Sequence, residues 1–202
     1  AVDTRQRLGA AALEWLFHQT AHAWCRQDAE RHDWQWLSLW AMDGTTFRTP
    51  DSADNRAHFG AQAYASGKVA SYPQVRAVSV TAIHTHLVSD IAFGEYGQNE
   101  MLYAKRLIGR IADHSLTVLD RGLLCAEILL GLTLSGQERH YLIPAKSNTK
   151  WEVLSGSADD CLVRMRVSPQ ARAKAPELPE HCVAWAVRMV SANGKARILL
   201  TS

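Results

Sequence analysis

The segment most informative about the fold is LSLWAMDGT, from Leu37 to Thr45. Its first six residues are apolar enough for a buried strand, and Asp43-Gly44 is typical of a turn that follows one. A second stretch, LTVLDRG from Leu116 to Gly122, has the same form: a short apolar strand that ends at an aspartate. If the two strands are neighbours in one sheet, Asp43 and Asp120 lie at the same edge, where a ligand reaches both.

These two aspartates are candidate metal ligands. Their carboxylates are hard oxygen donors of the kind that Mg²⁺ and Mn²⁺ prefer. Two such ions activate an attacking oxygen and stabilise a leaving one in phosphodiester chemistry. The residues alone leave an alternative open, because aspartate is also common at the start of an ordinary turn.

The segments on either side of these stretches predict a mixed α/β sheet. In chain order we expect a helix at 5–32, a strand at 37–42, a hairpin of 75–83 and 87–93, a helix from 99, a strand at 116–119, a helix at 123–134 and a strand at 140–143. Three strands able to pair antiparallel, followed by crossover units, are typical of such a sheet. In the first helix we expect Leu13, Leu16, Phe17 and Trp24 to form the face that packs on the sheet.

Residues 151–202 differ in their residue pattern from the chain before them. Short alternating segments flank a proline-rich loop, and Asn193-Gly194 is a strong signal for a hairpin turn. We therefore expect a β-rich unit attached to the core but outside its sheet. The predicted domains are a helical segment at 1–36, a core at 37–150 and this unit at 151–202.

Composition narrows the class of protein. The 202 residues are 47% hydrophobic and 21% charged, which are ordinary globular values. The net charge is +2, with −3 in residues 1–100 and +5 in residues 101–202, which favours a nucleic-acid partner only weakly. No apolar run approaches the roughly 20 residues that cross a bilayer, so no membrane is expected. The four cysteines form no C-x-x-C pair, so we expect free thiols in a reducing cytosol.

Several segments together resemble the IS4 family of insertion-sequence transposases. MDGTTFRTPD at 42–51 is similar to the first-aspartate segment of that family, and LDRG at 119–122 to the second. The segments that accompany them are NRAHFG at 55–60, Asn99-Glu100 at a helix start, HYLIPAK at 140–146 and NTK at 148–150. Each is short, but their order and spacing together are specific, and the resemblance covers about Arg5 to Ser202.

The resemblance implies an RNase H-like core, with a mixed sheet, flanking helices and a β-rich insertion after the fifth strand. It implies that Asp43 and Asp120 hold two Mg²⁺ or Mn²⁺ ions and that the intact enzyme cleaves transposon ends and joins them to target DNA. Such enzymes are expected to act as homodimers in the bacterial cytoplasm, at the nucleoid. The cations expected to contact DNA are Arg121, Lys146, Lys150 and Arg56.

The family's third acid is a glutamate in a Tyr, Arg, Glu, Lys pattern beyond the insertion. No such pattern occurs in this sequence, which also does not begin with Met, so we expect a core truncated at both ends with an incomplete insertion. The alternative to a catalytic core is a non-catalytic DNA-binding or domesticated fragment, and a structure-specific nuclease is a third reading. His84 and His86 are weaker metal candidates, since both fall in an expected turn.

Overall fold

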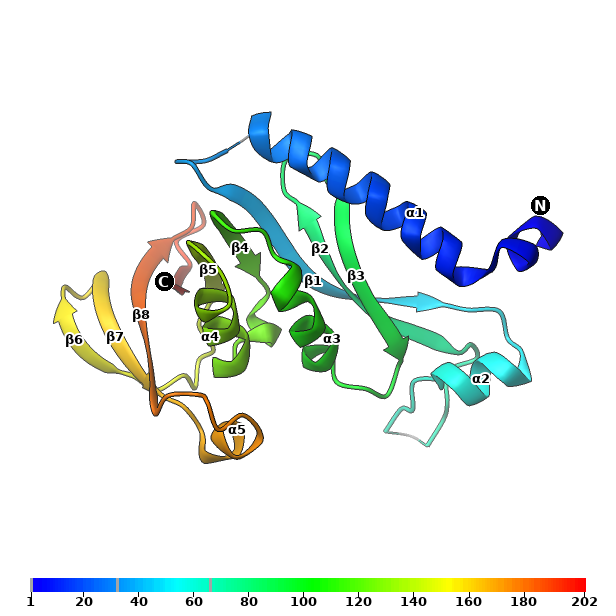
Figure 1. Ribbon diagram of the computed structural model, residues 1–202. Coiled ribbons are helices and arrows are strands. Elements are labelled where there is room, and N and C mark those ends of the chain that lie inside the picture. The colour runs from blue at the N-terminus through cyan, green and yellow to red at the C-terminus, as the bar shows by residue number, and fades with distance from the viewer. Residues whose placement is uncertain (1, 32, 66) are drawn as a thin grey trace.

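One sheet of nine strands organises the chain, in the order β3-β2-β1-β4-β5-β9-β8-β7-β6 (Figure 1). The computed structural model describes residues 2–31, 33–65 and 67–202. The strands are β1 (Ser38–Arg48), β2 (Gln74–Ala82), β3 (Val88–Glu95), β4 (Ser115–Leu119), β5 (Arg139–Pro144), β6 (Glu152–Gly156), β7 (Asp160–Arg166), β8 (His181–Val190) and β9 (Ala196–Thr201). The helices are α1 (Val2–Arg31), α2 (Ala53–Phe59), α3 (Glu100–Leu107), α4 (Ala126–Leu134) and α5 (Pro169–Lys174), with 3₁₀ turns η1 (Ile108–Arg110) and η2 (Arg121–Leu123).

The first five strands have the topology that the sequence predicts. β1 pairs antiparallel with β2, and β2 antiparallel with β3. On its other side β1 runs parallel to β4, and β4 runs parallel to β5, with α3 and α4 in the crossovers. This order and these directions are the RNase H-like arrangement, so the expected α/β class is confirmed.

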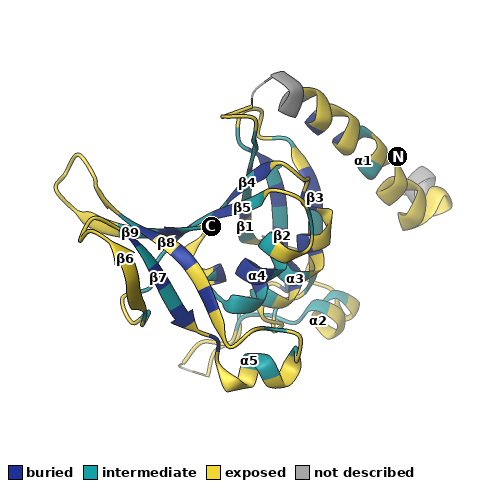
Figure 2. Cartoon of the chain, turned by 60° about the vertical axis from the view of Figure 1, so that its left-hand side comes forward, coloured by how far each residue is buried: buried dark blue, intermediate teal, exposed yellow. Residues whose placement is uncertain are grey.

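One face of this sheet is packed against helices. Met42 of β1 and Leu119 of β4 point into the core, where Leu107 of α3 and Ile128 of α4 are also buried. Burial of one such side chain contributes about 1.5–3 kcal/mol. Asn99 caps α3 as expected, because its side chain accepts a hydrogen bond of 3.0 Å from the Met101 amide. Figure 2 shows the buried residues concentrated on the strands and on the helix faces that meet them.

β1 is longer than the sequence suggests. The expectation that it ends at Asp43 is wrong, since the strand continues to Arg48 and pairs with β2 over its whole second half. Thr45, Thr46 and Phe47 have high strand propensity and extend the antiparallel ladder past the glycine. What ends near Asp43 is the parallel ladder with β4, whose last pair is Met42 with Leu119.

The unit at 151–202 is rich in strands, and its hairpin lies where Asn193-Gly194 places it. Gly194 has φ +78, and the Ser191 amide donates a hydrogen bond to the Lys195 carbonyl, which closes the turn between β8 and β9. The expectation that these strands lie outside the core sheet is wrong, because β9 is hydrogen-bonded antiparallel to β5. The proline-rich loop also contains a short helix, α5, which Ser168 caps and Pro169 begins.

α1 is helical as expected but packs on the sheet through other residues. Where burial is described in α1, Ala21 and Cys25 are buried and Phe17 is half-buried, whereas Leu13, Leu16 and Trp24 are exposed. The small side chains let the second half of the helix approach β3 closely (Figure 1). None of the described helices is long and apolar enough to cross a membrane.

Candidate metal site and nucleic-acid surface

Asp43 and Asp120 occupy neighbouring positions at one edge of the parallel part of the sheet. Met42 pairs with Leu119 as the last step of the β1–β4 ladder, and each aspartate is the next residue along its strand. Adjacent strands lie about 4.8 Å apart, so the two side chains start from closely spaced backbones. The structure therefore brings the two sequence-predicted acids together.

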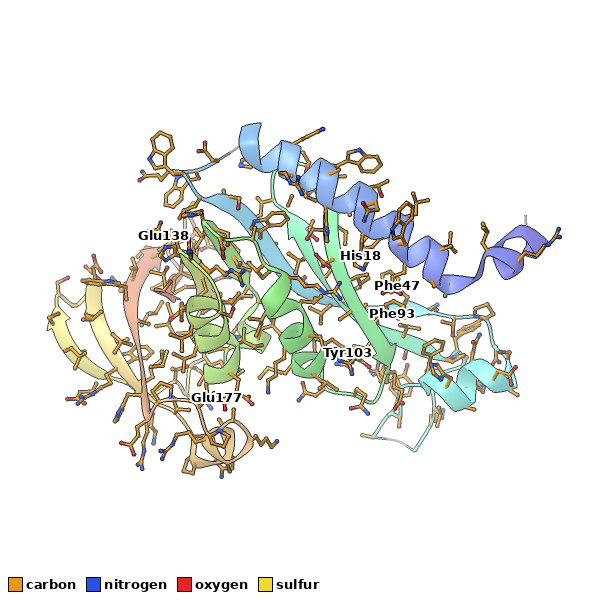
Figure 3. The ribbon with its side chains drawn as sticks, viewed as in Figure 1. His18, Phe47, Phe93, Tyr103, Glu138 and Glu177 are labelled. Atoms are coloured by element: carbon orange, nitrogen blue, oxygen red, sulfur yellow. The ribbon has the colours of Figure 1, made fainter. Side chains whose placement is uncertain are left out.

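Both aspartates point away from the helices. Met42 and Leu119 are buried on the helix side, and successive side chains of a strand alternate between faces. Asp43 and Asp120 are exposed, and the alternation along β1 puts Phe47, which Figure 3 labels, on the same face as Asp43. A ligand approaching this face meets both carboxylates without displacing the core.

Local hydrogen bonds orient each carboxylate and leave one of its oxygens free to bind a cation. Asp43 Oδ1 accepts from the Gly44 amide at 2.8 Å. Asp120 Oδ2 accepts from the Gly122 amide at 2.7 Å and so caps η2. Among the described residues the second oxygen of each carboxylate accepts no hydrogen bond. Two exposed aspartates with one such oxygen each fit a hard divalent cation that keeps most of its water.

A third carboxylate lies close to Asp43 in space but on the other side of the sheet. Glu100, at the start of α3, packs its carboxylate directly over Gly44, in the space that a Cβ atom would fill. Arg76 Nη1 lies 4.0 Å from that carboxylate. Because Gly44 and Asp43 face opposite sides of β1, the strand itself separates Glu100 from the Asp43–Asp120 edge. This explains why glycine follows Asp43.

A basic cavity of about 700 Å³ adjoins Asp120. Arg121 and Lys146, both predicted from the sequence, lie in its wall, together with Lys195 and Arg197 of the β8–β9 hairpin. Lys146 Nζ also donates to the Leu124 carbonyl at 3.2 Å, which ties β5 to the turn after Asp120. Lys195 and Arg197 were not predicted from the sequence. The Asn-Gly turn placed them on a hairpin, but nothing in the sequence placed that hairpin beside β5.

The other two predicted cations lie elsewhere. Lys150 lines a neighbouring cavity of about 390 Å³ that Lys146 also borders. Arg56, on α2, donates to Asp51 at 2.5 Å and to the Ser71 carbonyl at 2.7 Å. The hydrogen bond from Arg56 is the main reason that the pKa of Asp51 is lowered. Contacts of Arg56 and Lys150 with DNA stay predictions.

The weaker sequence candidates do not join this site. His84 and His86 lie in the turn between β2 and β3, as expected. The half-buried Cys125 is no activated nucleophile either, because desolvation raises the pKa of its thiol. The four cysteines form no disulfide among the described residues.

An RNase H-like sheet with two aspartates at adjacent strand positions and a basic cavity beside them has the architecture of a nucleic-acid-processing core. Residues 37–189 match the family described as the transposase DDE domain, and the chain belongs to that family. The resemblance to IS4-family transposases is thereby confirmed.

Two similar proteins from Escherichia coli K-12 support the same family. The transposase InsG for insertion sequence element IS4 is 37% identical over 202 residues, which is 100% of this chain and 45% of that protein. The InsZ protein is 36% identical over 155 residues, which is 75% of this chain and 51% of that protein. The chain thus spans about half the length of these relatives.

A comparison with solved structures gives a distant match. The piggyBac transposase in a synaptic complex with hairpin DNA is 12% identical, with a TM-score of 0.43 over 81% of this chain and 33% of that one.

Proposed function

We propose that this chain supplies two of the acidic residues of a transposase that cuts and rejoins DNA during movement of an insertion sequence. The observation that carries the proposal is the β1–β4 register, which sets Asp43 beside Asp120 at one sheet edge. The family match and the IS4-type relatives support it. The proposed cofactor is Mg²⁺ or Mn²⁺, two ions in the intact enzyme.

The residues of the site have distinct roles in this proposal. Asp43 and Asp120 would hold the cations at a fixed place, because the strands and the Gly44 and Gly122 amides fix both carboxylates. Divalent ions held there would activate the attacking oxygen, first of water and then of a DNA 3′-hydroxyl, and would neutralise the oxygen that leaves. The protein forms no covalent intermediate, so its contribution is positioning and electrostatic stabilisation.

The basic cavity gives the DNA backbone a place beside the acids. The residues around this one space come from η2, the loop after β5 and the β8–β9 hairpin: Arg121, Lys146, Lys195 and Arg197. Their positive charges offset those of the phosphates and hold the scissile bond against the carboxylates. We further propose that the intact protein acts on DNA as a homodimer, in the bacterial cytoplasm at the nucleoid.

The proposed site needs a third carboxylate, which the described residues do not supply. Glu100 packs its carboxylate over Gly44, but β1 separates it from the Asp43–Asp120 edge. A glutamate approaching the open face of the sheet would complete the ligand set. The coding sequence beyond Ser202 tests this directly: a helix with the Tyr, Arg, Glu, Lys pattern supports the proposal, and an immediate stop codon supports the non-catalytic alternative.

The biochemical test uses the open reading frame that encodes this chain, expressed in full. With a transposon-end duplex and Mg²⁺, we expect strand cleavage that Asp43→Asn and Asp120→Asn each abolish, while DNA binding persists. Asp54→Asn, an exposed aspartate on α2, is the matched control and should cut normally. Cleavage that survives Asp43→Asn would contradict the assignment of this residue.

The basic cavity has a separate test, which this chain alone permits. Lys195→Ala and Arg197→Ala should each reduce the slope of log K against log salt by about 0.9 if each cation meets one phosphate. Lys68→Ala, an exposed lysine between α2 and β2, should leave that slope unchanged. Equal slopes for all variants would remove the hairpin from the DNA-binding surface.

A further inference from the structure

We propose a second metal site, for Zn²⁺ or a similar transition-metal ion, formed by His18 and His22 of α1 and Asp90 of β3. It lies on the helix-covered side of the sheet, because Asp90 pairs with Val80 and Val80 with Met42, whose side chains point into the core. Asp43 and Asp120 face the other side. The new site is therefore separate from the proposed catalytic one and does not depend on it.

The spacing of the three ligands suits one ion. His18 and His22 are four residues apart, which places both imidazoles on one face of α1. Figure 3 shows His18 between α1 and the sheet. One ligand atom from each of the three residues lies within 4.8 Å of the other two. His22 Nε2 is 3.1 Å from Asp90 Oδ2, and His18 Nδ1 is 3.6 Å from Asp90 Oδ1.

These distances are close to what tetrahedral zinc requires. Zinc binds imidazole nitrogen and carboxylate oxygen at about 2.0–2.2 Å, so two ligand atoms of a tetrahedron are about 3.4 Å apart. Small side-chain rotations would bring all three atoms to that separation. Imidazole nitrogen favours zinc, copper or nickel over magnesium, so the two proposed sites differ in metal preference.

Because the cluster is partly buried, its polar groups need partners. Asp90 is only 1% exposed, and a buried carboxylate is costly unless it is paired. His18 Nδ1 is buried and has no hydrogen-bond partner among the described residues. A metal ion bound by this nitrogen and by Asp90 satisfies both groups. His18 Nε2 then carries the ring proton and faces Glu14 Oε1 at 3.8 Å, an orientation that favours Nδ1 as the ligand.

Arg110 is the competitor of the metal. Its Nη1 lies 2.9 Å from Asp90 Oδ1 and 3.4 Å from His18 Nε2, so a guanidinium now supplies the positive charge beside Asp90. The Arg110 side chain is 51% exposed and can rotate into solvent. A cavity of about 460 Å³, lined by His22, Asp90 and Arg110, gives the ion access and leaves room for a water as fourth ligand.

The consequence is a metal-dependent attachment of α1 to the sheet. α1 buries few of its large apolar side chains, so ligands from both α1 and β3 on one ion would add to a modest contact. Binding to the folded state alone stabilises that state in proportion to the logarithm of metal concentration. Added Zn²⁺ should therefore raise the Tm of the purified chain.

The test is a titration of the purified chain with Zn²⁺ at neutral pH, followed by calorimetry and thermal melting. We expect one equivalent bound and a raised Tm. His22→Gln should weaken binding by at least about tenfold, since it removes a direct ligand. This side chain is 48% exposed, so the variant should fold, as circular dichroism would verify. His58→Gln, an exposed histidine on α2, is the matched control and should bind normally.

Two further measurements decide between this site and other ligands. Arg110→Gln should bind Zn²⁺ more tightly than the unaltered chain, because its competitor is gone; weaker binding would contradict the role of Arg110. Co²⁺ in place of Zn²⁺ should give a tetrahedral spectrum without a thiolate charge-transfer band. No binding, unchanged affinity in His22→Gln, or a thiolate band would each overturn the proposal.

Discussion

Asp120 performs two tasks at once, and substitutions can separate them. Its carboxylate caps η2 through the Gly122 amide, and it offers its other oxygen to the proposed metal site. Asparagine keeps a side-chain oxygen that accepts the same hydrogen bond but loses the charge. Alanine loses both.

We therefore predict different outcomes for the two variants of Asp120. Asp120→Asn should melt within a few degrees of the unaltered chain, yet bind Mn²⁺ at least about tenfold more weakly, because a hard cation needs an anionic ligand. Asp120→Ala should lose the metal and also about 0.5–2 kcal/mol of the free energy of unfolding. Urea unfolding and Mn²⁺ titration measure the two effects. Normal Mn²⁺ affinity in Asp120→Asn would contradict a ligand role.

At the scale of residues, the sequence predicted the positions of the two aspartates better than the positions of the cations. Asp43 and Asp120 stand in apolar contexts that determine their strands, and the strands determine their places. Arg121 is the next residue after Asp120, so its position is determined by the same strand. Lys195 and Arg197 could not be assigned, because their position depends on the pairing of β9 with β5, a contact between segments about 55 residues apart.

Among the elements, α3 and β3 meet at a position that only glycine fits. A Cβ atom at Gly94 would lie 2.7 Å from Tyr103 Oη and 3.3 Å from Tyr103 Cε1. Tyr103 is 2% exposed, and its hydroxyl donates to the Glu95 carbonyl at 3.0 Å, so the ring has little freedom to move (Figure 3). The close approach of the helix to the strand requires the missing side chain.

We predict that Gly94→Ala costs about 1–3 kcal/mol of the free energy of unfolding, because the added methyl overpacks this contact. Gly97→Ala is the matched control: no heavy atom lies within 4 Å of its Cβ position, so the change should stay within about 0.5 kcal/mol. Urea denaturation of both variants makes the comparison. Equal stabilities would mean that α3 shifts freely on β3.

Asp113 joins the turn before β4 to the turn before β5. The Gln137 amide donates to Asp113 Oδ1 at 3.0 Å, and Arg139 Nε donates to the same oxygen at 2.8 Å. The hydrogen bond from Gln137, followed by that from Arg139, lowers the pKa of Asp113. A carboxyl group with a lowered pKa in the folded state stabilises that state above its unfolded pKa of about 3.9.

The lowered pKa of Asp113 determines how stability depends on pH. The unaltered chain should exceed Asp113→Asn in stability at pH 7, and the difference should shrink as the pH falls below about 4 and the carboxylate is protonated. Urea unfolding at pH 7 and pH 3 measures it. A difference of the same size at both values would show that the charge of Asp113 contributes nothing.

Element by element, local signals predicted the core well and the boundaries less well. The Asn99 cap, the hairpin at 84–86 and the Asn193-Gly194 turn depend on neighbouring residues, and all are confirmed. The length of β1 and the place of β9 depend on partners far along the chain. The packed face of α1 was wrong because its contact with β3 uses small and polar side chains rather than its large apolar ones.

At the scale of the whole molecule, the sheet has one face packed on α1, α3 and α4 and one face without helices among the described residues. By strand alternation and register, the open face carries the two aspartates and also the exposed rings of Phe47 and Phe93, which Figure 3 labels. Two aspartates are few ligands for two dications beside a polyanion, since Mg²⁺ gains little from a site that replaces little of its water.

We therefore predict that these 202 residues alone neither cut nor join DNA. A transposon-end duplex incubated with the purified chain in Mg²⁺ or Mn²⁺ should stay intact, although it can still bind through the basic cavity. Asp120→Ala is the control. Cleavage by the unaltered chain that disappears in this variant would show that the site is complete without a third acid.

Iron-directed backbone cleavage tests most directly whether Asp43 and Asp120 share a metal ion. Fe²⁺ in place of Mg²⁺, with ascorbate and peroxide, generates hydroxyl radicals that cut the chain next to the bound ion. We predict cuts near residue 43 and near residue 120 together, both lost in Asp43→Asn and both outcompeted by Mg²⁺. Cuts at one segment only, or cuts near residue 120 that persist in Asp43→Asn, would contradict it.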